Sequence, residues 1–423
     1  MADLEVVEIC AGAGGQALGL EQAGFEHALA VELDPAACAT LRANRPGWKV
    51  AEGDAADPEL WRPRDYRGVA LLAGGVPCPP FTVAGRQLGA ADERDLFAWA
   101  VELCAVIRPR ALLLENVRGL STSRFSAYRQ HVADRLRDLG YVPGWRLLHA
   151  CDFGVPQLRP RTVLVALREA DAPWFRWPAP SPRPPATVGQ TVGGLMAARS
   201  WPGAAAWARR ADRIAPTIVG GSKKHGGADL GPTRAKRAWA ELGVDGLGLA
   251  DQVPGPDADP ALVPRLTCEM VTRLQGWRDE WEWHFSGGKT ARYRQIGNAF
   301  PPPVAGAVGS AIRRALEHEG APEPVPGSGT PGAAAYAHVH DPVFRVLRSR
   351  DDFLTARQIA ELAAGLSLAA VLGSLRHLGR DFELHVADCA DGPAYRLGPF
   401  RAFLGQREHA RHQHFAASRA TIS

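Results

Sequence analysis

The opening part of the chain alternates short apolar runs with helical patterns, and this alternation limits the folds that the chain can adopt. Most runs end in a glycine turn or a carboxylate and lead into a spacing of apolar residues that is typical of an amphipathic helix. Strands that alternate with helices predict an α/β fold with a parallel sheet, in which ligands bind at the carboxyl ends of the strands. The runs cover residues 4–10, 25–31, 50–54, 69–73 and 111–114.

The first run leads into the glycine turn at residues 11–15, and a helical pattern then continues to Gly24. Glycines let the backbone approach a ligand, and the following helix N-terminus favours negative charge, so this turn predicts a nucleotide-like cofactor. Glu32 ends the second run and is a candidate for binding ribose hydroxyls, while Asp54 ends the third and could accept from an adenine amino group. A structural turn with helix-capping or solvated carboxylates is the alternative.

The fourth run leads into a stretch of glycine and proline around Cys78. Proline fixes its own φ and pushes the preceding residue toward extended geometry, so the thiol lies in a stiff turn that suits a nucleophile. A buried, inert cysteine is the alternative. Glu115 and Asn116 follow the next run, at a neighbouring carboxyl end of the same predicted sheet.

Three polar residues then alternate at Gln157, Arg159 and Arg161. Period-two spacing places them on one face of a predicted strand. Two adjacent guanidinium groups repel unless they meet carboxylates, phosphates or other acceptors, which indicates a binding role. A solvated edge strand is the alternative.

Composition excludes several classes of protein. The seven cysteines are scattered without a C-x-x-C pair, which argues against a disulfide framework and a zinc site, so no metal is expected. The N-terminus lacks a secretion signal and no apolar run approaches bilayer length, so we expect a cytoplasmic protein without membrane contact.

A net charge of +4 is mild, but nine Lys or Arg against two Asp give residues 199–237 a net charge of +7. Basic residues interleaved with glycine in exposed loops predict nucleic-acid contact, and a solvated basic surface is the alternative. The candidate DNA contacts are Lys223, Lys224, Arg234, Lys236 and Arg237.

The later chain divides by composition and pattern. A helix capped by Thr267 and closed by Gly276 is predicted, then a helix from about Pro303 to His318. Residues 319–340 form a Pro/Gly/Ala linker. Beyond it, three helical patterns and a hairpin at 341–400 resemble a winged helix-turn-helix, with a helical packing or dimerisation module as the alternative.

Six ordered motifs in this chain resemble those of the DNA (cytosine-5)-methyltransferase family of bacterial restriction-modification type, over about residues 4–318. They are Glu8-Ile-Cys-Ala-Gly-Ala-Gly-Gly15, Pro77-Cys-Pro-Pro-Phe-Thr82, Glu115-Asn-Val117, Gln157-Leu-Arg-Pro-Arg161, the segment Arg265 to Gly276, and Gln295-Ile-Gly-Asn298.

This resemblance implies methyl transfer from S-adenosylmethionine to carbon 5 of a cytosine that is flipped out of duplex DNA. Cys78 would add to carbon 6, Glu115 would meet ring nitrogen 3, and Arg159 and Arg161 would hold base and thiol in place. The implied base pocket comprises Pro77, Asn116 and Gln157. The implied cofactor-binding residues are Cys10, Ala11, Gly12, Ala13, Gly15, Glu32, Leu33, Asp54, Ala55, Pro77, Leu96 and Asn298.

The implied architecture is a Rossmann-like catalytic domain with a smaller target-recognition domain. Three residues depart from the family's pattern: Cys10 replaces a usual phenylalanine, Pro79 a common glutamine and Thr82 a serine. The expected ranges are 1–167 for the first catalytic part, 168–264 for target recognition, 265–318 for the return to the catalytic domain, 319–340 for the linker, 341–400 for the winged-helix-like module and 401–423 for a tail.

Alternative functions are a tRNA cytosine-5 methyltransferase and a catalytically silent DNA-binding regulator. The long basic segment favours DNA over tRNA, and the intact residues Cys78, Glu115, Arg159 and Arg161 argue against a silent protein. A dinucleotide-dependent oxidoreductase would leave the cysteine and arginine motifs unexplained. The sequence leaves open the target site, the oligomeric state and whether a cognate restriction endonuclease acts as partner.

Overall fold

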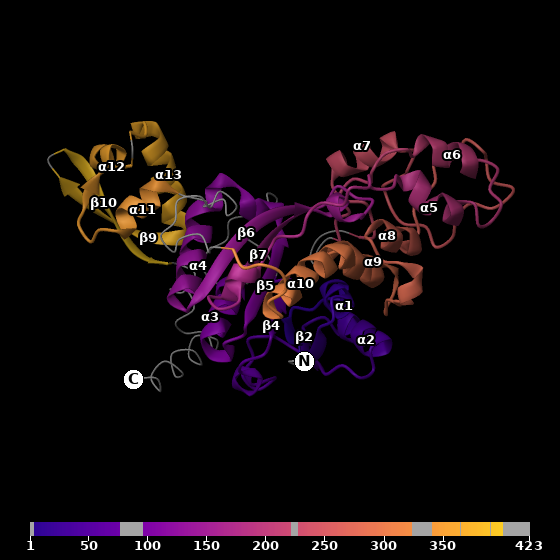
Figure 1. Cartoon of the computed structure of the whole chain (residues 1–423). Helices are drawn as coiled ribbons and strands as arrows, with labels where there is room; N and C mark the ends of the chain where they lie inside the picture. Colours follow the sequence, from indigo (N-terminus) through magenta and orange to yellow (C-terminus); the bar gives the residue numbers. More distant parts are fainter. Residues whose placement is uncertain are drawn as a thin grey trace.

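A seven-stranded sheet forms the centre of the computed structural model, which describes residues 4–76, 96–220, 227–323, 341–363, 365–389 and 391–400 (Figure 1). Its strand order is β3-β2-β1-β4-β5-β7-β6. Strands β3, β2, β1, β4 and β5 run parallel to one another, whereas β7 runs antiparallel to β5 and β6. The strands are β1 (Glu5–Ile9), β2 (Glu26–Glu32), β3 (Val50–Glu52), β4 (Leu71–Gly74), β5 (Ala111–Val117), β6 (Tyr141–His149) and β7 (Pro160–Arg168).

Helices cover both faces of the sheet because successive strand side chains point to opposite sides. Val6, Leu71 and Leu113 share a core with α10. Val7, Leu72 and Leu112 share another core with α3 and α4. The helices of this domain are α1 (Gly15–Gln22), α2 (Pro35–Asn44), α3 (Leu96–Ile107), α4 (Ser126–Asp138) and α10 (Pro302–Leu316).

The α/β prediction is confirmed, and two strand boundaries differ from those expected. β5 continues to Val117, so Glu115 and Asn116 lie within the strand rather than after it. β7 begins at Pro160, so Gln157 and Arg159 precede the strand, and the prediction that they share one strand face with Arg161 is wrong. Gln157 instead forms an isolated parallel bridge with Ala215, which directs this segment toward a different part of the chain.

A small lobe (residues 188–298) packs around a tryptophan-rich core, with Trp201, Trp207 and Trp239 buried, and this core continues into the sheet domain through Leu18 and Leu41. Thr233–Glu241 is helical, so the prediction of an exposed loop at residues 233–237 is wrong; Trp239 anchors this helix to the core. The predicted cap at Thr267 is confirmed, because its hydroxyl accepts from the Met270 backbone N–H. The lobe contains α5 (Val188–Met196), α6 (Ala204–Arg210), α7 (Thr233–Glu241), α8 (Cys268–Leu274) and α9 (Lys289–Asn298).

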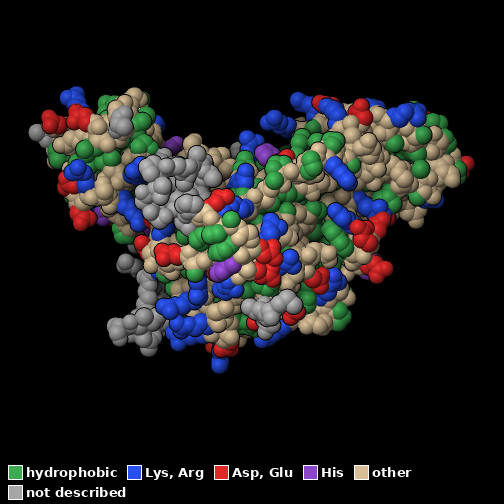
Figure 2. Space-filling view, in the orientation of Figure 1, with side chains coloured by type: hydrophobic (Ala, Val, Ile, Leu, Met, Phe, Trp, Pro, Cys, Tyr) green, Lys and Arg blue, Asp and Glu red, His purple; other side chains and the backbone are tan. Residues whose placement is uncertain are grey.

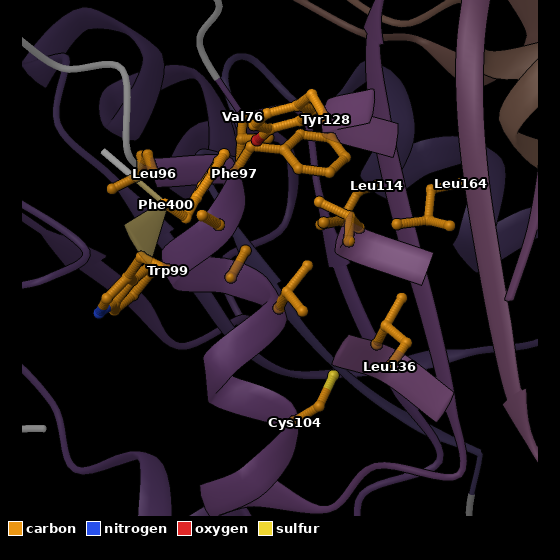
Figure 3. Close-up of a cluster of buried hydrophobic side chains, with 14 of the residues drawn as sticks. Val76, Leu96, Phe97, Trp99, Cys104, Leu114, Tyr128, Leu136, Leu164 and Phe400 are labelled. Carbon is orange, nitrogen blue, oxygen red and sulfur yellow. The ribbon is translucent and has the colours of Figure 1, made fainter. Parts of the chain in front are cut away.

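The C-terminal module (residues 341–400) has the predicted three helices and hairpin, together with one additional short strand. Its antiparallel sheet has the order β8-β10-β9. The elements are α11 (Pro342–Arg348), β8 (Leu354–Thr355), α12 (Ala356–Leu362), α13 (Leu368–Asp381), β9 (Phe382–Cys389) and β10 (Gly392–Phe400). Its buried side chains belong to the same core as α3 and α4, and Figure 3 shows Phe400 near Leu96, Phe97 and Tyr128. The module therefore lacks a separate core.

Within the described ranges, no helix combines the length and the apolar character needed to cross a bilayer.

Candidate active site

Glu115 and Arg161 form a buried ion pair at the carboxyl end of β5. The Arg161 Nε lies 2.6 Å from Glu115 Oε1, and each side chain is only 10% exposed. The antiparallel register places Glu115 opposite Val163 and Val117 opposite Arg161. Glu115 and Arg161 are therefore diagonal neighbours on one face of the sheet, where long side chains can reach each other.

Burial raises the pKa of Glu115 above its ordinary value, and the positive charges of Arg161 and Arg159 oppose that rise. A carboxyl group with a raised pKa holds its proton more readily and can donate it to a reacting group. Burial and the neighbouring Arg161 lower the pKa of Arg159, but a guanidinium starts so high that it keeps its charge in proteins. The site thus combines a candidate proton donor with two fixed positive charges.

Arg159 binds backbone carbonyl groups from two later parts of the chain. One Nη donates to the Ile218 carbonyl at 2.7 Å, and the other to the carbonyls of Gly297 at 2.7 Å and Ala299 at 2.9 Å. The Gln157 amide oxygen accepts from the Ile218 N–H at 2.9 Å. The two side chains therefore connect the segment before β7 with the small lobe and with the segment that follows α9.

The chain that leads toward Cys78 lies next to Glu115. A Cβ added at Gly75 would be 3.7 Å from Glu115 Oε2. The Asn116 amide nitrogen donates to the Val76 carbonyl at 3.4 Å. Pro77 and Cys78 lie outside the described residues, so their predicted roles rest on the sequence and on this approach.

The glycine turn after β1 has an unusual backbone. Cys10 has a positive φ of 50°, which is uncommon for a non-glycine residue, and Gly12 and Gly14 have φ values of 57° and 87°. A Cβ added at Gly12 would meet no heavy atom within 4 Å, whereas one at Gly14 would approach the Trp283 ring to 2.4 Å. Gly12 therefore borders open space that a ligand can fill, and Gly14 permits close packing.

Glu32 ends β2 beside this turn. Its carboxylate accepts from the backbone N–H groups of Gly12 and Asp34, each at 2.7 Å. Burial raises the pKa of Glu32, and these two hydrogen bonds oppose the rise. A carboxylate has about four lone-pair positions, so further acceptor capacity remains for hydroxyl groups.

The other predicted cofactor residues lie around the same strand ends. Leu33 is 62% exposed, which leaves an apolar side chain available beside Glu32. Asp54 follows β3, and its carboxylate accepts from the Ala56 N–H at 3.0 Å. Ala11, Ala13, Ala55 and Leu96 are buried. Asn298 ends α9, and a Cβ added at Gly220 would be 2.4 Å from its amide oxygen, so Asn298 lies against the backbone at Gly220.

Two tryptophans near the glycine turn were not predicted as part of the site. The Trp283 indole N–H donates to the Ala13 carbonyl at 3.0 Å, and a Cβ at Gly15 would be 3.1 Å from the Trp277 ring. They follow Gly276 in the sequence, far from residues 11–15. A tryptophan-rich stretch after a recognised motif was the available signal, but it does not indicate where the rings pack.

The predicted DNA contacts are placed in part. Arg234 and Arg237 are exposed on α7, and the Lys236 Nζ lies 3.0 Å from Asp229 Oδ2. Lys223 and Lys224 lie outside the described residues. Among the residues that the structure does describe, no group of three or more His, Cys, Asp or Glu is arranged to hold a metal ion.

Comparison with known proteins identifies the family. The model of the C-5 cytosine-specific DNA methylase family matches residues 4–314. The chain is 61% identical to Type II methyltransferase M.NaeI of Lentzea aerocolonigenes across 100% of both chains. It is 48% identical to Type II methyltransferase M.NgoMIV of Neisseria gonorrhoeae, over 74% of this chain and 98% of that protein.

A solved structure shares the fold. The crystal structure of a putative DNA modification methyltransferase encoded within an Escherichia coli prophage superposes with a TM-score of 0.52 at 20% identity, covering 74% of this chain and 99% of that one. Together with the family match and the high identity to M.NaeI, the sheet and its site lead to one conclusion. The chain belongs to the C-5 cytosine-specific DNA methylase family, and it methylates carbon 5 of cytosine in DNA with S-adenosylmethionine as the methyl donor.

Proposed function

We propose that Cys78, Glu115 and Arg161 carry the chemistry of cytosine methylation in this chain, with Arg159 as a positioning residue. The observation that carries this assignment is the buried pair of Glu115 and Arg161, with Gly75 beside the Oε2 atom of the carboxyl group. Cys78 follows Gly75 by three residues, so its segment begins beside the candidate proton donor.

In the proposed reaction the Cys78 thiolate forms a bond to carbon 6 of a cytosine that has been rotated out of the duplex. Glu115 gives a proton to ring nitrogen 3, which stabilises the electron pair displaced toward carbon 5. After carbon 5 has been methylated, a water molecule acting as base takes its proton, and the freed electron pair re-forms the double bond between carbons 5 and 6. The Cys78 thiolate leaves from carbon 6, and nitrogen 3 returns its proton to Glu115. Arg161 holds the carboxyl group of Glu115 throughout.

Several residues fit S-adenosylmethionine at the neighbouring strand ends. The open space beside Gly12 accommodates a ligand against the backbone, and the lone pairs of Glu32 suit ribose hydroxyls. Exposed Leu33 offers an apolar surface, and Asp54 an acceptor for an adenine amino group. When bound, S-adenosylmethionine supplies the methyl group. Cys10, Ala11, Ala13, Gly15, Ala55, Pro77, Leu96 and Asn298 complete the proposed set.

For DNA, the proposal assigns Lys223, Lys224, Arg234, Lys236 and Arg237 to backbone or base contact, and Pro77, Asn116 and Gln157 to the base pocket. The relatives are named Type II methyltransferases, which supports a role beside a restriction endonuclease of the same sequence specificity. Bisulfite sequencing of plasmid DNA from an expressing host would define the methylated sequence. A cognate endonuclease should fail to cut that plasmid but cut the same plasmid from a host without this protein.

A trapping experiment tests the catalytic assignment. Duplex DNA with 5-fluorocytosine at the methylated position should form a stable covalent complex with the wild-type protein, because fluorine cannot leave as a proton does. Cys78→Ala should form no such complex and transfer no methyl group, yet bind DNA. Cys151→Ala is the matched control, because Cys151 is a partly buried thiol outside the proposed site. Normal turnover by Cys78→Ala would refute the assignment.

A further inference from the structure

Aromatic packing and an ion pair hold the C-terminal module on helix α4. The Phe400 ring centroid lies 5.5 Å from that of Tyr128 and 4.5 Å from that of His131. Phe382 meets the same histidine edge-on at 5.4 Å. Arg348 Nη1 lies 2.6 Å from Asp134 Oδ2, one turn further along α4. These contacts fix the position of the module relative to the catalytic sheet.

This position brings α13 close to the carboxyl ends of the parallel strands, where the proposed active site lies. Helix α13 lies against the short 3-10 helix Ser123–Phe125, which follows the end of β5 and the Glu115 motif. Figure 1 places the module and the small lobe on opposite sides of the sheet domain. Figure 2 shows a hollow between the two lobes. The module therefore borders the side from which DNA must reach Glu115, opposite the small lobe.

Positive charge gathers where α13 meets the sheet domain. Arg376, His377 and Arg380 are exposed on the C-terminal half of α13, and spacings of three and four residues place them on neighbouring parts of one helix surface. Arg124 belongs to the 3-10 helix Ser123–Phe125, against which α13 lies. Burial lowers the pKa of His377, the charges of Arg380, Arg124 and Arg376 lower it further, and the charge of Asp341 opposes this fall.

Two acidic residues lie near this cluster: Asp381 directly follows Arg380, and Asp341 is engaged within the module. The Asp341 carboxylate accepts from the Phe344 backbone N–H at 3.0 Å and from the Ser374 hydroxyl at 2.9 and 2.7 Å to its two oxygens. Its charge is therefore used to cap α11 and to tie it to α13. Arg124, Arg376 and Arg380 supply three guanidinium groups here, and the His377 ring can donate a hydrogen bond in its neutral form.

The N-terminal half of α13 does not suit base reading. A recognition helix contacts base edges mainly with its N-terminal residues. Here that half begins Leu368-Ala-Ala-Val-Leu372, and the Leu368 side chain is 51% exposed. These side chains have no hydrogen-bonding groups to distinguish bases. The cationic C-terminal half can instead bind phosphate groups, which carry no sequence information.

We propose that Arg124, Arg376, His377 and Arg380 form a contact for the phosphate backbone of duplex DNA that flanks the methylated site, on the side opposite the small lobe. The family model ends at residue 314, so this contact lies largely outside the part of the chain that defines the family. Alignment with M.NaeI extends over the whole chain, module included. The contact would extend the duplex footprint without changing which sequence is methylated.

Salt-dependent binding to a long and a short mixed-sequence duplex tests this proposal, with the full-length protein. Each lost phosphate contact lowers the slope of log affinity against log salt by about one unit. Arg376→Gln with Arg380→Gln should lower it by about two on the long duplex and remove the advantage of the long duplex over the short one. Arg124→Gln, which leaves the module unchanged, should lower it by about one.

The matched control is Arg64→Gln with Arg67→Gln, which removes the same charge at exposed positions before β4, toward the amino ends of the parallel strands. The control should keep the wild-type slope, and all variants should keep the wild-type melting temperature and bisulfite pattern. An unchanged slope in the Arg376 and Arg380 variant, or an equal fall in the control, would overturn the proposal. Either result would leave the methylation activity itself unaffected.

Discussion

Glu115→Gln should separate the catalytic role of Glu115 from its structural role. Glutamine keeps the shape of glutamate and an oxygen that can accept from Arg161, but it cannot give an acidic proton. Loss of a positioned proton donor lowers a rate by roughly 10²- to 10⁴-fold. We expect a fall of that size in single-turnover methyl transfer at saturating DNA and S-adenosylmethionine, with cofactor affinity nearly unchanged.

The same variant leaves the Arg161 charge without its carboxylate. The two atoms are 2.6 Å apart and the side chains are almost entirely buried, so breaking the pair should cost up to about 3–5 kcal/mol of unfolding free energy. The oxygen of glutamine should reduce that cost. Combining Glu115→Gln with Arg161→Met removes the unpaired charge and should recover much of the melting temperature, but none of the rate.

Two outcomes would refute this reasoning. A Glu115→Gln protein that keeps a rate within a few-fold of wild type would show that no proton from residue 115 is needed. Recovery of the rate in the double variant would show that Glu115 acts only by neutralising Arg161. The pH profile gives an independent check: burial raises the pKa of Glu115, so a rate that needs its proton should fall as pH rises through that value. Glu115→Gln should lack this fall.

Four further substitutions test the geometry. Gly12→Ala and Gly14→Ala both place a side chain at positive φ, which should cost about 1–2 kcal/mol of unfolding free energy each. In calorimetry, Gly12→Ala should weaken S-adenosylmethionine binding with a modest loss of stability. Gly14→Ala should also lower the melting temperature sharply, because its Cβ meets Trp283. Burial lowers the pKa of His131 to about 4, below the ordinary value of about 6.5 in the unfolded chain. The protein should therefore lose at most about 3 kcal/mol of unfolding free energy as pH falls from about 6.5 to about 4. His131→Phe should remove this pH dependence in thermal melts. Phe400→Ala should cost roughly 3–5 kcal/mol in denaturant titrations, and an unchanged midpoint would contradict the docking of the module on α4.

Local patterns were sufficient to predict most of the sheet domain. The apolar run before Arg108 predicts a helix from Leu96 that ends at Ile107, and the structure confirms that end because the run is long and periodic. The Thr267 cap and Gly276 closure were likewise readable, since each depends on residues within one helix. The helix at Thr233–Glu241 was missed because arginine, lysine and glycine dominate its neighbourhood, and only burial of Trp239 in a distant core decides the conformation.

Contacts between distant segments could not be predicted in the same way. The pairing of Glu115 with Arg161 depends on the antiparallel register of β5 and β7, and the motifs alone do not specify that register. The C-terminal module was expected to fold apart from the catalytic domain. Its hairpin instead contributes Phe400 to the core beside Tyr128, because α4 presents an apolar surface that its own domain does not cover. Truncation before residue 341 would expose that surface to water.

Arg159 shows how one motif residue can link catalysis to target recognition. It is 1% exposed, and its guanidinium donates to carbonyls on the small lobe and on the segment after α9, rather than projecting into open space. Its charge nevertheless acts on Glu115, because it opposes the rise in the pKa of that carboxyl group. A shift of the small lobe that moved the Ile218 carbonyl would therefore move a charge that tunes the candidate proton donor. We therefore expect the target recognition proposed for the small lobe and the proton donation proposed for Glu115 to be coupled through this one side chain.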